Sequence, residues 1–326
     1  MLANNNEAII NKLAKNSVKT NKKQYAILFF TIILSAFMLF CVFTIGMTYL
    51  NSSRLQNTRL NGAEYDIVTM NGFTSEQLNT LQQNENIRSV GIESYAGFIQ
   101  STEYDKTVEI GLLWCDEVFW DNLMSPARTK LDGHYPQNKN ELMVTKDILK
   151  TCGNENLSVG DSLILTYENN TGVYTDEFVI SGIWDGYGDT SAGFVSKAFY
   201  DETGYDLKND GILCIKLNCN YVFPTTIQSI EKSLDFSDRQ IFAPTGYIEN
   251  SFKLLLGICG LALVICLSAY LLIYNILYLS VSGKIRYYGL LQSLGMTKKQ
   301  LVRFIIKQMI LVGILGIFIG NLLGII

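Results

Sequence analysis

The side chains of this sequence that could do chemistry are mostly carboxylates and thiols. The 326 residues contain 30 Asp and Glu and 7 Cys, but a single histidine, His134. No H-E-x-x-H motif or paired Cys and His spacing accompanies that histidine. The sequence also lacks G-x-S-x-G and the phosphate-binding G-x-x-x-x-G-K-[ST]. We therefore predict no catalytic site, no cofactor and no metal on this chain.

The cysteines do not form a recognisable pair, and none belongs to a C-x-x-C motif. Those in the long polar part of the chain are Cys115, Cys152, Cys214 and Cys219. Those in apolar segments are Cys41, Cys259 and Cys266. A disulfide could form among the first four in an oxidising compartment, but buried free thiols are the expected state.

Three apolar blocks divide the sequence and must position everything else. Residues 25–50 contain no charge, residues 252–279 only Lys253, and residues 304–326 only Lys307. A helix needs ~20 mostly apolar residues to cross a bilayer, so we expect spans at 25–50, 251–280 and 304–326. A secretory signal peptide is the alternative for the first block, but a signal has an apolar core of only ~7–15 residues and a small-residue cleavage site.

The distribution of charge predicts the orientation. Residues 1–24 carry five lysines and one acid, and residues 281–303 carry five basic residues and no acid. Residues 51–250 carry 29 of the 30 acids and 14 of the 26 Lys and Arg, a net charge of −15. Short basic loops stay in the cytoplasm, whereas long acidic segments are translocated. We expect a multi-pass plasma-membrane protein with a cytoplasmic N-terminus and residues 51–250 outside, and the acidic exterior argues against nucleic-acid binding.

Residues 51–250 alternate strand-like and helix-like stretches and show no internal repeat. Strands are expected at 64–70, 87–99, 107–114, the start of 140–152, 161–167, 174–184 and 212–217. Helices are expected at 74–83 with Thr74 as its cap, at the end of 140–152, and at 225–234 after Pro224. The turn-like residues 168–172 predict a hairpin. This mixture indicates an α+β domain large enough for its own core.

The two cytoplasmic segments have different patterns. Residues 7–20 place apolar side chains near one helical face among lysines, which predicts an amphipathic leader helix on the inner leaflet; a merely solvated leader is the alternative. In residues 281–303, one helical face is predicted from the spacing of Tyr287, Leu290, Leu291 and Leu294. Gly295 then ends the helix in a left-handed conformation, and Thr297 with Gln300 forms a capping box for the next helix. This predicts a knuckle that faces a partner beneath the membrane, with a plain helical hairpin as the alternative.

Residues 282–301, SGKIRYYGLLQSLGMTKKQL, resemble the cytoplasmic signature of FtsX/MacB-type permeases, R-x-x-x-G-x-L-x-x-x-G-x-[ST]-x-x-[QE]. The matching positions are Arg286, Gly289 (one residue early), Leu291, Gly295, Thr297 and Gln300. Tyr288 stands where many members carry an acid, as in the Gram-positive variant. The leader, the first span, the outer domain and the second span follow the layout of this family, and residues 133–167 and 178–182 resemble parts of its outer domain.

The resemblance implies a membrane α-helical protein with an extracytoplasmic α+β domain of the MacB periplasmic-core type. It implies the permease subunit of an ABC transporter, in which a separate P-loop ATPase drives movements of the outer domain, for export of or resistance to peptides, drugs or lipoproteins. It also implies a second permease chain or half as a dimer partner. The residues expected to couple to the ATPase are Lys284, Arg286, Tyr288, Gly289, Leu290, Leu291, Leu294, Gly295, Thr297, Lys298, Lys299 and Gln300.

Two other functions remain open. A membrane-anchored sensor could regulate an extracytoplasmic partner such as a cell-wall hydrolase, although residues 1–24 and one short loop leave little room for a cytoplasmic output domain. A membrane-anchored ectoenzyme would need a convergent polar site in residues 51–250. The half-unit of the resembled family has four spans, so we expect that this sequence is truncated or that its fourth helix lies on another chain.

Overall fold

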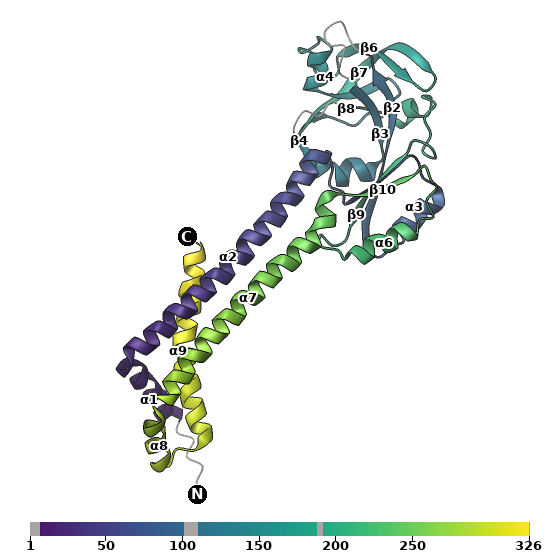
Figure 1. Ribbon diagram of the computed structural model, residues 1–326. Coiled ribbons are helices and arrows are strands. Elements are labelled where there is room, and N and C mark those ends of the chain that lie inside the picture. The colour runs from purple at the N-terminus through teal and green to yellow at the C-terminus, as the bar shows by residue number, and fades with distance from the viewer. Residues whose placement is uncertain (1–6, 101–109, 188–191, 326) are drawn as a thin grey trace. The chain divides into compact units, whose positions relative to one another are not determined.

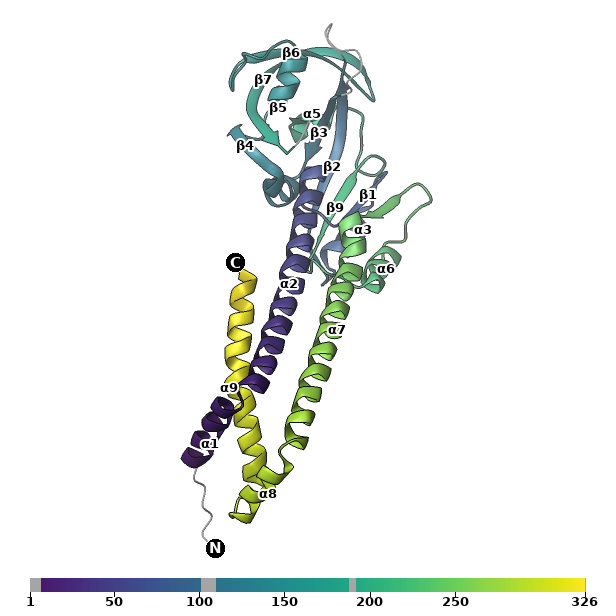
Figure 2. The same cartoon turned by 60° about the vertical axis from the view of Figure 1, so that its left-hand side comes forward.

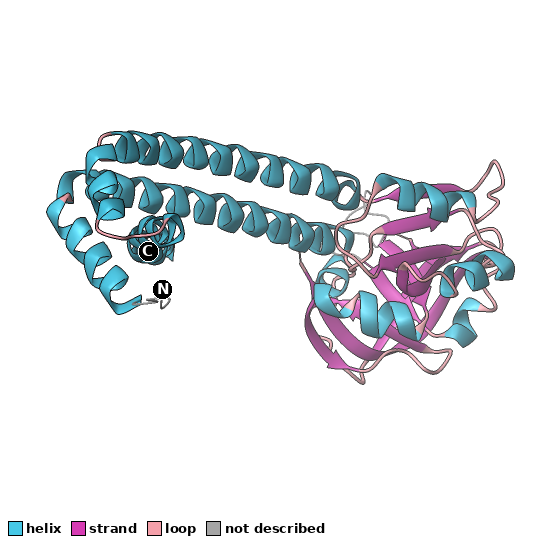
Figure 3. Cartoon of the chain, turned by 90° about the horizontal axis from the view of Figure 1, so that it is seen from below, coloured by secondary structure: helices cyan, strands magenta, loops and turns pink. Residues whose placement is uncertain are grey.

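The computed structural model describes residues 7–100, 110–187 and 192–325. The chain divides into two compact units. We call Met1–Tyr49 with Leu255–Ile326 the helical unit, and Leu50–Leu254 the α/β unit. Figure 3 shows that the helical unit is built from helices alone and that the strands lie in the α/β unit. We describe each unit by itself.

Three long helices are apolar enough, by length and composition, to cross a membrane. They are α2 (Lys22–Asn61), α7 (Gly246–Ser282) and α9 (Lys298–Ile325), and they contain the three predicted spans. The fold class predicted from the sequence is thus confirmed. With 40 and 37 residues, α2 and α7 are longer than their apolar blocks, and each continues from the helical unit into the first or last residues of the α/β unit.

In the helical unit, two short helices pack at the ends of the long ones. Helix α1 (Glu7–Thr20) is the predicted leader, and α8 (Ile285–Ser293) lies between α7 and α9 in sequence. The buried side chains Ile10 and Ala14 of α1 pack with Tyr288 of α8 and Phe304 of α9. Part of the apolar face of the leader is therefore covered by α8 and α9, whereas Ile9 of the same helix is 53% exposed.

Helices α2 and α9 approach each other closely through glycines. A Cβ on Gly320 would lie 2.6 Å from the carbonyl oxygen of Ile33, and one on Gly316 would lie 2.9 Å from the side chain of Ile32. Small residues at such positions let two helix backbones pack together where lipid gives no hydrophobic driving force. These glycines explain how α9 is held against α2.

The α/β unit is built on one continuous mixed sheet (Figure 1). Its strands are β1 (Ile67–Met70), β2 (Ile87–Ile99), β3 (Ile110–Cys115), β4 (Arg128–Gly133), β5 (Glu141–Thr145), β6 (Ser162–Asn169), β7 (Gly172–Gly186), β8 (Ala192–Val195), β9 (Ile212–Leu217) and β10 (Ile241–Pro244). Their order is β10-β1-β9-β2-β3-β8-β5-β7-β4, with β3–β8 and β5–β7 parallel. Because β6 pairs with both β2 and β7, strands β2-β3-β8-β5-β7-β6 close into a ring (Figure 2).

Two hydrophobic cores stabilise the two ends of this sheet. Inside the ring, side chains such as Leu112, Leu142 and Phe178 are buried together with α4 (Lys146–Thr151) and α5 (Lys197–Tyr200). On the open part, α3 (Ser75–Gln82) and α6 (Pro224–Lys232) bury Leu81 and Ile230 against β1 and β9. A third cluster lies beneath a π-helix, η1 (Val118–Leu123), which is followed by the short η2 (Ser125–Ala127).

Most of the predicted strands and helices are present. The predicted strands 87–99 and 212–217 coincide with β2 and β9, and the predicted hairpin is β6–β7. Thr74 caps α3 through a capping box with Gln77. Residues 107–109 of one predicted strand lie outside the described residues, and the rest of it falls in β3. Strands β4, β8 and β10 and the π-helix were not predicted.

A buried ion-pair cluster joins the segments next to α2 and α7 to the sheet. Lys216 of β9 places its Nζ 3.2 Å from Asp66 Oδ2 and 3.1 Å from Glu64 Oε1. The same Asp66 oxygen accepts a hydrogen bond from the Leu217 N–H (2.9 Å), and the Asp66 carbonyl accepts one from the Thr245 N–H (2.8 Å). Burial raises the pKa of Asp66, and Lys216 opposes that rise. Residues just after α2 and just before α7 are thus tied to one central strand.

Candidate functional site

The predicted knuckle is present, and its turn is fixed by the main chain. Gly295 has a φ of +97°, in the left-handed region. Its N–H donates to the Gln292 carbonyl (3.0 Å), and the next N–H, of Met296, donates back to the Leu291 carbonyl (3.1 Å). These two bonds are the Schellman motif that ends a helix. The prediction that Gly295 ends α8 is therefore confirmed.

The next helix begins at once through a second local motif. The Thr297 N–H donates to Gln300 Oε1 (3.0 Å), and the Gln300 N–H donates to Thr297 Oγ1 (3.3 Å). This reciprocal pair is the predicted capping box, and it satisfies N–H groups at the start of α9 that have no partner inside the helix. A helix end and a helix start that follow each other so closely leave little freedom to the angle between α8 and α9.

One face of α8 exposes apolar side chains. Tyr287 is 41% exposed, Leu290 63% and Leu294 83%. We call these three residues the knuckle patch; their spacing of i, i+3 and i+7 places them on one side of the helix. Three predicted cations, Arg286, Lys298 and Lys299, are also exposed, as are Gly289, Gly295 and Thr297. Exposed apolar side chains within a basic surround are typical of a protein-docking surface.

The other predicted coupling residues are turned toward the protein. Tyr288 is buried against α1 and Phe304, and Leu291 packs at the edge of the same cluster. Gln300 is half-buried and occupied by its cap. The sequence pattern placed Leu291 with Leu290 on one face, and it did not include Tyr287 among the coupling residues. Contact with α1 buries one side of the apolar face of α8, and a pattern within residues 281–303 cannot reveal that contact.

Lys284, also predicted as a coupling residue, points inward as well. Its Nζ is buried, lies 5.6 Å from the ring centroid of Tyr25, and has no hydrogen-bond partner among the described residues. Burial lowers the pKa of Lys284. Beside it, the Tyr25 hydroxyl donates to Gln308 Oε1 in a buried contact between α2 and α9. This polar cluster joins three elements at the base of the helical unit and is not available to a docking protein.

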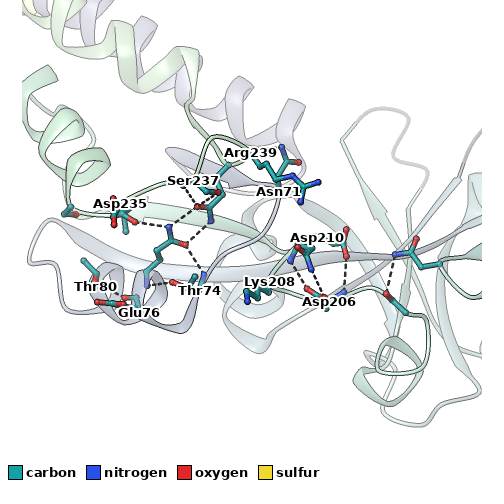
Figure 4. A pocket seen from close by; sticks show the side chains of 17 residues that line it. Asn71, Thr74, Glu76, Thr80, Asp206, Lys208, Asp210, Asp235, Ser237 and Arg239 are labelled. Atoms are coloured by element: carbon teal, nitrogen blue, oxygen red, sulfur yellow. Dashed lines mark hydrogen bonds between the residues drawn. The ribbon is translucent and has the colours of Figure 1, made fainter.

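The α/β unit contains a polar cleft of about 1030 Å³ (Figure 4). Two amides that hydrogen-bond each other line it: Gln77 also donates to the Leu234 carbonyl (2.8 Å), and Gln240 also donates to the Gly72 carbonyl (2.8 Å). The acids that line it are Glu76, Asp206, Asp210 and Asp235, and the bases are Lys208 and Arg239. No aromatic ring occurs among its described lining residues.

The chemistry of this cleft favours binding over catalysis. Hydrogen bonds from Asn209, to both oxygens of the Asp206 side chain, lower the pKa of that carboxyl. A carboxylate that is held ionised is a poor general acid at neutral pH. The cleft, lined by acids and by two bases, can bind polar and cationic groups. Within the described ranges, no group of three His, Cys, Asp or Glu side chains could hold a metal ion.

Comparisons with known proteins identify the C-terminal part of the chain. Residues 259–326 match the family model described as FtsX-like permease C-terminal. The resemblance predicted from residues 282–301 is thereby confirmed. A search of curated protein sequences found no significant match.

Several solved structures are similar to part of this chain at low identity. The periplasmic region of MacB from Actinobacillus actinomycetemcomitans is 12% identical, with a TM-score of 0.39, over 60% of this chain and 95% of that one. The extracellular domain of the ABC-type transporter YknZ from Gram-positive bacteria is 12% identical, with a TM-score of 0.36, over 55% and 98%. A domain of a putative permease protein from Porphyromonas gingivalis is 9% identical, with a TM-score of 0.35, over 56% and 89%.

Proposed function

We propose that this chain, whose residues 259–326 form the C-terminal region of an FtsX-like permease, is the permease subunit of an ABC transporter with its ATPase on a separate chain. The observation that carries the proposal is the knuckle patch. Its apolar side chains are exposed, and they directly precede the Gly295 turn and the Thr297 capping box, which fix the main chain that follows them. The ATPase covers Leu290 and Leu294, and the surrounding cations attract acidic groups on its surface.

Movement of the docked ATPase passes to the α/β unit through the helices. A force on α8 acts on α9 through the fixed turn, and on α1 through Tyr288. The continuous helices α2 and α7 carry it to the residues held by Lys216 and Asp66. The α/β unit lies outside the membrane and acts there on a polar substrate or an extracytoplasmic protein, for which the cleft of Figure 4 is the candidate site.

The test is co-purification of the tagged chain from gently solubilised membranes of its own organism. We expect a P-loop ATPase to co-purify with the native chain and to be lost from Leu290→Asp and Leu294→Asp, which each place a carboxylate on an exposed site where no core packing is disturbed. Val173→Asp, on an exposed strand residue of the α/β unit, is the matched control and should retain the ATPase. Absence of any ATPase under conditions that keep a known transporter intact would contradict the proposal.

The proposed orientation has an independent test that uses a native thiol. Cys219 is exposed in the α/β unit, whereas Cys115 and Cys214 are buried. A membrane-impermeant maleimide should label the native chain in intact cells, and this label should be lost from Cys219→Ser. A cysteine placed at the exposed Ser293 of α8 should react only after the membrane is permeabilised. Labelling of Cys219 only after permeabilisation would contradict the proposed orientation, because it would place the α/β unit on the cytoplasmic side.

A further inference from the structure

A second pocket of the α/β unit lies beside the first turns of α7. It has a volume of about 400 Å³ and is bordered by α6, β10 and the start of α7. Its apolar lining consists of Val222, Pro224, Ile227, Phe242, Pro244 and Ile248. Its charged lining consists of Glu231, Glu249 and Lys253. The volume falls within the range of small-molecule sites, and the lining combines an apolar floor with groups of both signs.

The position of this pocket in the chain places it at a membrane surface. Lys253 is the only charged residue of residues 252–279, so it marks the point where α7 becomes apolar. A lysine at such a point holds its ammonium group at the level of the lipid headgroups. Glu249 lies one helical turn before Lys253, on the polar side of this boundary. The pocket thus spans the transition from headgroup to hydrocarbon.

An exposed aromatic side chain next to the pocket also indicates contact with lipid. Phe223 is 60% exposed, and its ring centroid lies 4.5 Å from that of Phe252, at the start of the apolar block. Phe223 occupies the N-cap of α6 and makes no side-chain capping bond, although Ser, Thr, Asp and Asn are the residues that stabilise this position. Neither capping nor core packing explains a phenylalanine here, whereas an apolar environment beside α7 does.

The three charged groups of the pocket are free to bind a ligand. Glu249 and Lys253 have the i, i+4 spacing that favours an ion pair, yet neither they nor Glu231 make an ion pair or hydrogen bond through their side chains within the described residues. One cation and two carboxylates over an apolar floor are complementary to a molecule with a phosphate, an ammonium group and an acyl chain.

We infer that this pocket binds an aminophospholipid of the outer leaflet, such as phosphatidylethanolamine. The acyl chain lies on the apolar floor beside Phe223, Lys253 binds the phosphate, and Glu249 with Glu231 binds the ammonium group. The bound lipid holds the α/β unit at the membrane surface near the start of α7. This inference rests on the proposed extracytoplasmic position of the α/β unit, and it assigns the lipid as a bound partner rather than as the transported substrate.

Native mass spectrometry of the full chain, released from mixed phosphatidylethanolamine and phosphatidylglycerol, tests the assignment. The native chain should retain phosphatidylethanolamine in preference. Glu249→Gln should abolish that preference, and Lys253→Gln should reduce retention of both lipids on the order of tenfold, the effect of one charge-assisted hydrogen bond. Glu155→Gln and Lys150→Gln, which lie outside the pocket, are the controls. Equal retention of the two lipids by the native chain, or unchanged retention in Lys253→Gln, would overturn the inference.

A competitor separates a lipid site from a site for a soluble headgroup. Glycerophosphoethanolamine carries the same phosphate and ammonium groups without acyl chains, so it should not displace the bound lipid at equal concentration. Full displacement would show that the pocket recognises the headgroup alone, and the lipid assignment would be wrong.

A fluorescent variant tests the contact of Phe223 with acyl chains without removing an aromatic ring. Phe223→Trp in bilayers with brominated acyl chains should gain a tryptophan signal that the bromines quench. Tyr174→Trp, at an exposed residue of the β6–β7 hairpin, should gain a signal that they do not quench. Equal quenching in both variants would contradict the proposed contact of Phe223 with the acyl chains. If Cys219 is labelled from outside while lipid preference is absent, only the lipid site fails and the proposed function stands.

Discussion

Glu93 should make the stability of the α/β unit depend on pH. This residue lies on β2, opposite Cys115 of β3 and Ile212 of β9, on the face covered by η1. The titratable groups that face it are Tyr65, Cys115, Tyr135 and Cys214, all of which are neutral near pH 7 because burial raises the pKa of each. Among the described residues no cation offsets the burial of the carboxylate, and this burial raises the pKa of Glu93 from 4.5 to about 7.

The sign and the size of the effect follow from these two values. Between 4.5 and about 7 the folded chain holds a proton that the unfolded chain releases, so this contribution to stability is present at low pH and is lost as the pH rises through about 7. Between about pH 8 and about pH 5.5, linkage gives a gain of at most ~2 kcal/mol in the free energy of unfolding. Glu93→Gln has no charge to neutralise and should lack this gain.

Urea unfolding of the full chain in detergent measures this difference. All three tryptophans, Trp114, Trp120 and Trp184, lie in the α/β unit, so their fluorescence reports its unfolding. The free energy of Glu93→Gln minus that of the native chain should be larger at about pH 8 than at about pH 5.5 by up to ~2 kcal/mol. Glu155→Gln, at an exposed site, should show no such change. The same difference at both pH values would refute the argument that Glu93 is protonated on folding.

Three further predictions concern the helices and the ion-pair cluster. Gly295→Ala should lower the free energy of unfolding of the helical unit by ~1–2 kcal/mol, because alanine is strained at a φ of +97°. Gly289→Ala should raise it by ~0.5–1 kcal/mol, because the added Cβ meets open space. Thermal unfolding followed by circular dichroism of the full chain measures both. Lys216→Met should destabilise the α/β unit by ~3–5 kcal/mol near neutral pH by stranding a buried carboxylate, and by less at low pH, where that carboxylate takes up a proton. Gly320→Leu should separate α9 from α2 and lower the melting temperature, while Gly313→Leu, whose Cβ meets nothing within 4 Å, should be tolerated.

The parts of the fold that could be predicted are those set by local chemistry. The Gly295 turn, the Thr297 capping box and the Thr74 cap each depend on hydrogen bonds within about six residues, so their sequence motifs were sufficient. The three apolar helices were predictable for a similar reason, since only length and composition decide whether a helix can cross a bilayer. Motifs of this kind need no knowledge of the rest of the chain.

The missed strands depend on partners far away in the sequence. Residues 128–133 of β4 are mostly exposed and polar, with none of the alternation that marks a half-buried strand. They form a strand because β7 offers them an open edge, as in the pairing of Leu131 with Trp184. Strands β8 and β10 have only four residues each, too few for a pattern to be read. The closure of the ring by β6 likewise depends on a pairing, between Phe98 and Glu168, that no local signal encodes.

The candidate site shows the same division at the level of single side chains. Periodicity correctly indicated that α8 carries an apolar face, but it could not divide that face between the protein and a partner. The division depends on α1, whose Ile10 meets Tyr288 across nearly the whole length of the sequence. Once α1 covers one side, Leu290 and Leu294 remain as the surface that an ATPase could cover. The prediction of a leader helix on the inner leaflet gave no reason to expect that residues 7–20 pack against α8.

The proposed coupling requires that α2 and α7 transmit displacement rather than bend, and the sequence favours this. All four prolines lie in the α/β unit, and none interrupts a long helix, so the usual cause of a sharp kink is absent. At one end the Gly295 and Thr297 motifs hold the turn that follows α8; at the other, Asp66 holds the main chain beside both helices through Leu217 and Thr245. Because Lys216 opposes the rise that burial causes in the pKa of Asp66, loss of the ion pair should uncouple the two helices from the sheet before it affects ATPase docking. Lys216→Met, in a background that keeps the unit folded, should therefore retain the ATPase in co-purification and lose transport, and loss of the ATPase instead would place the coupling defect elsewhere.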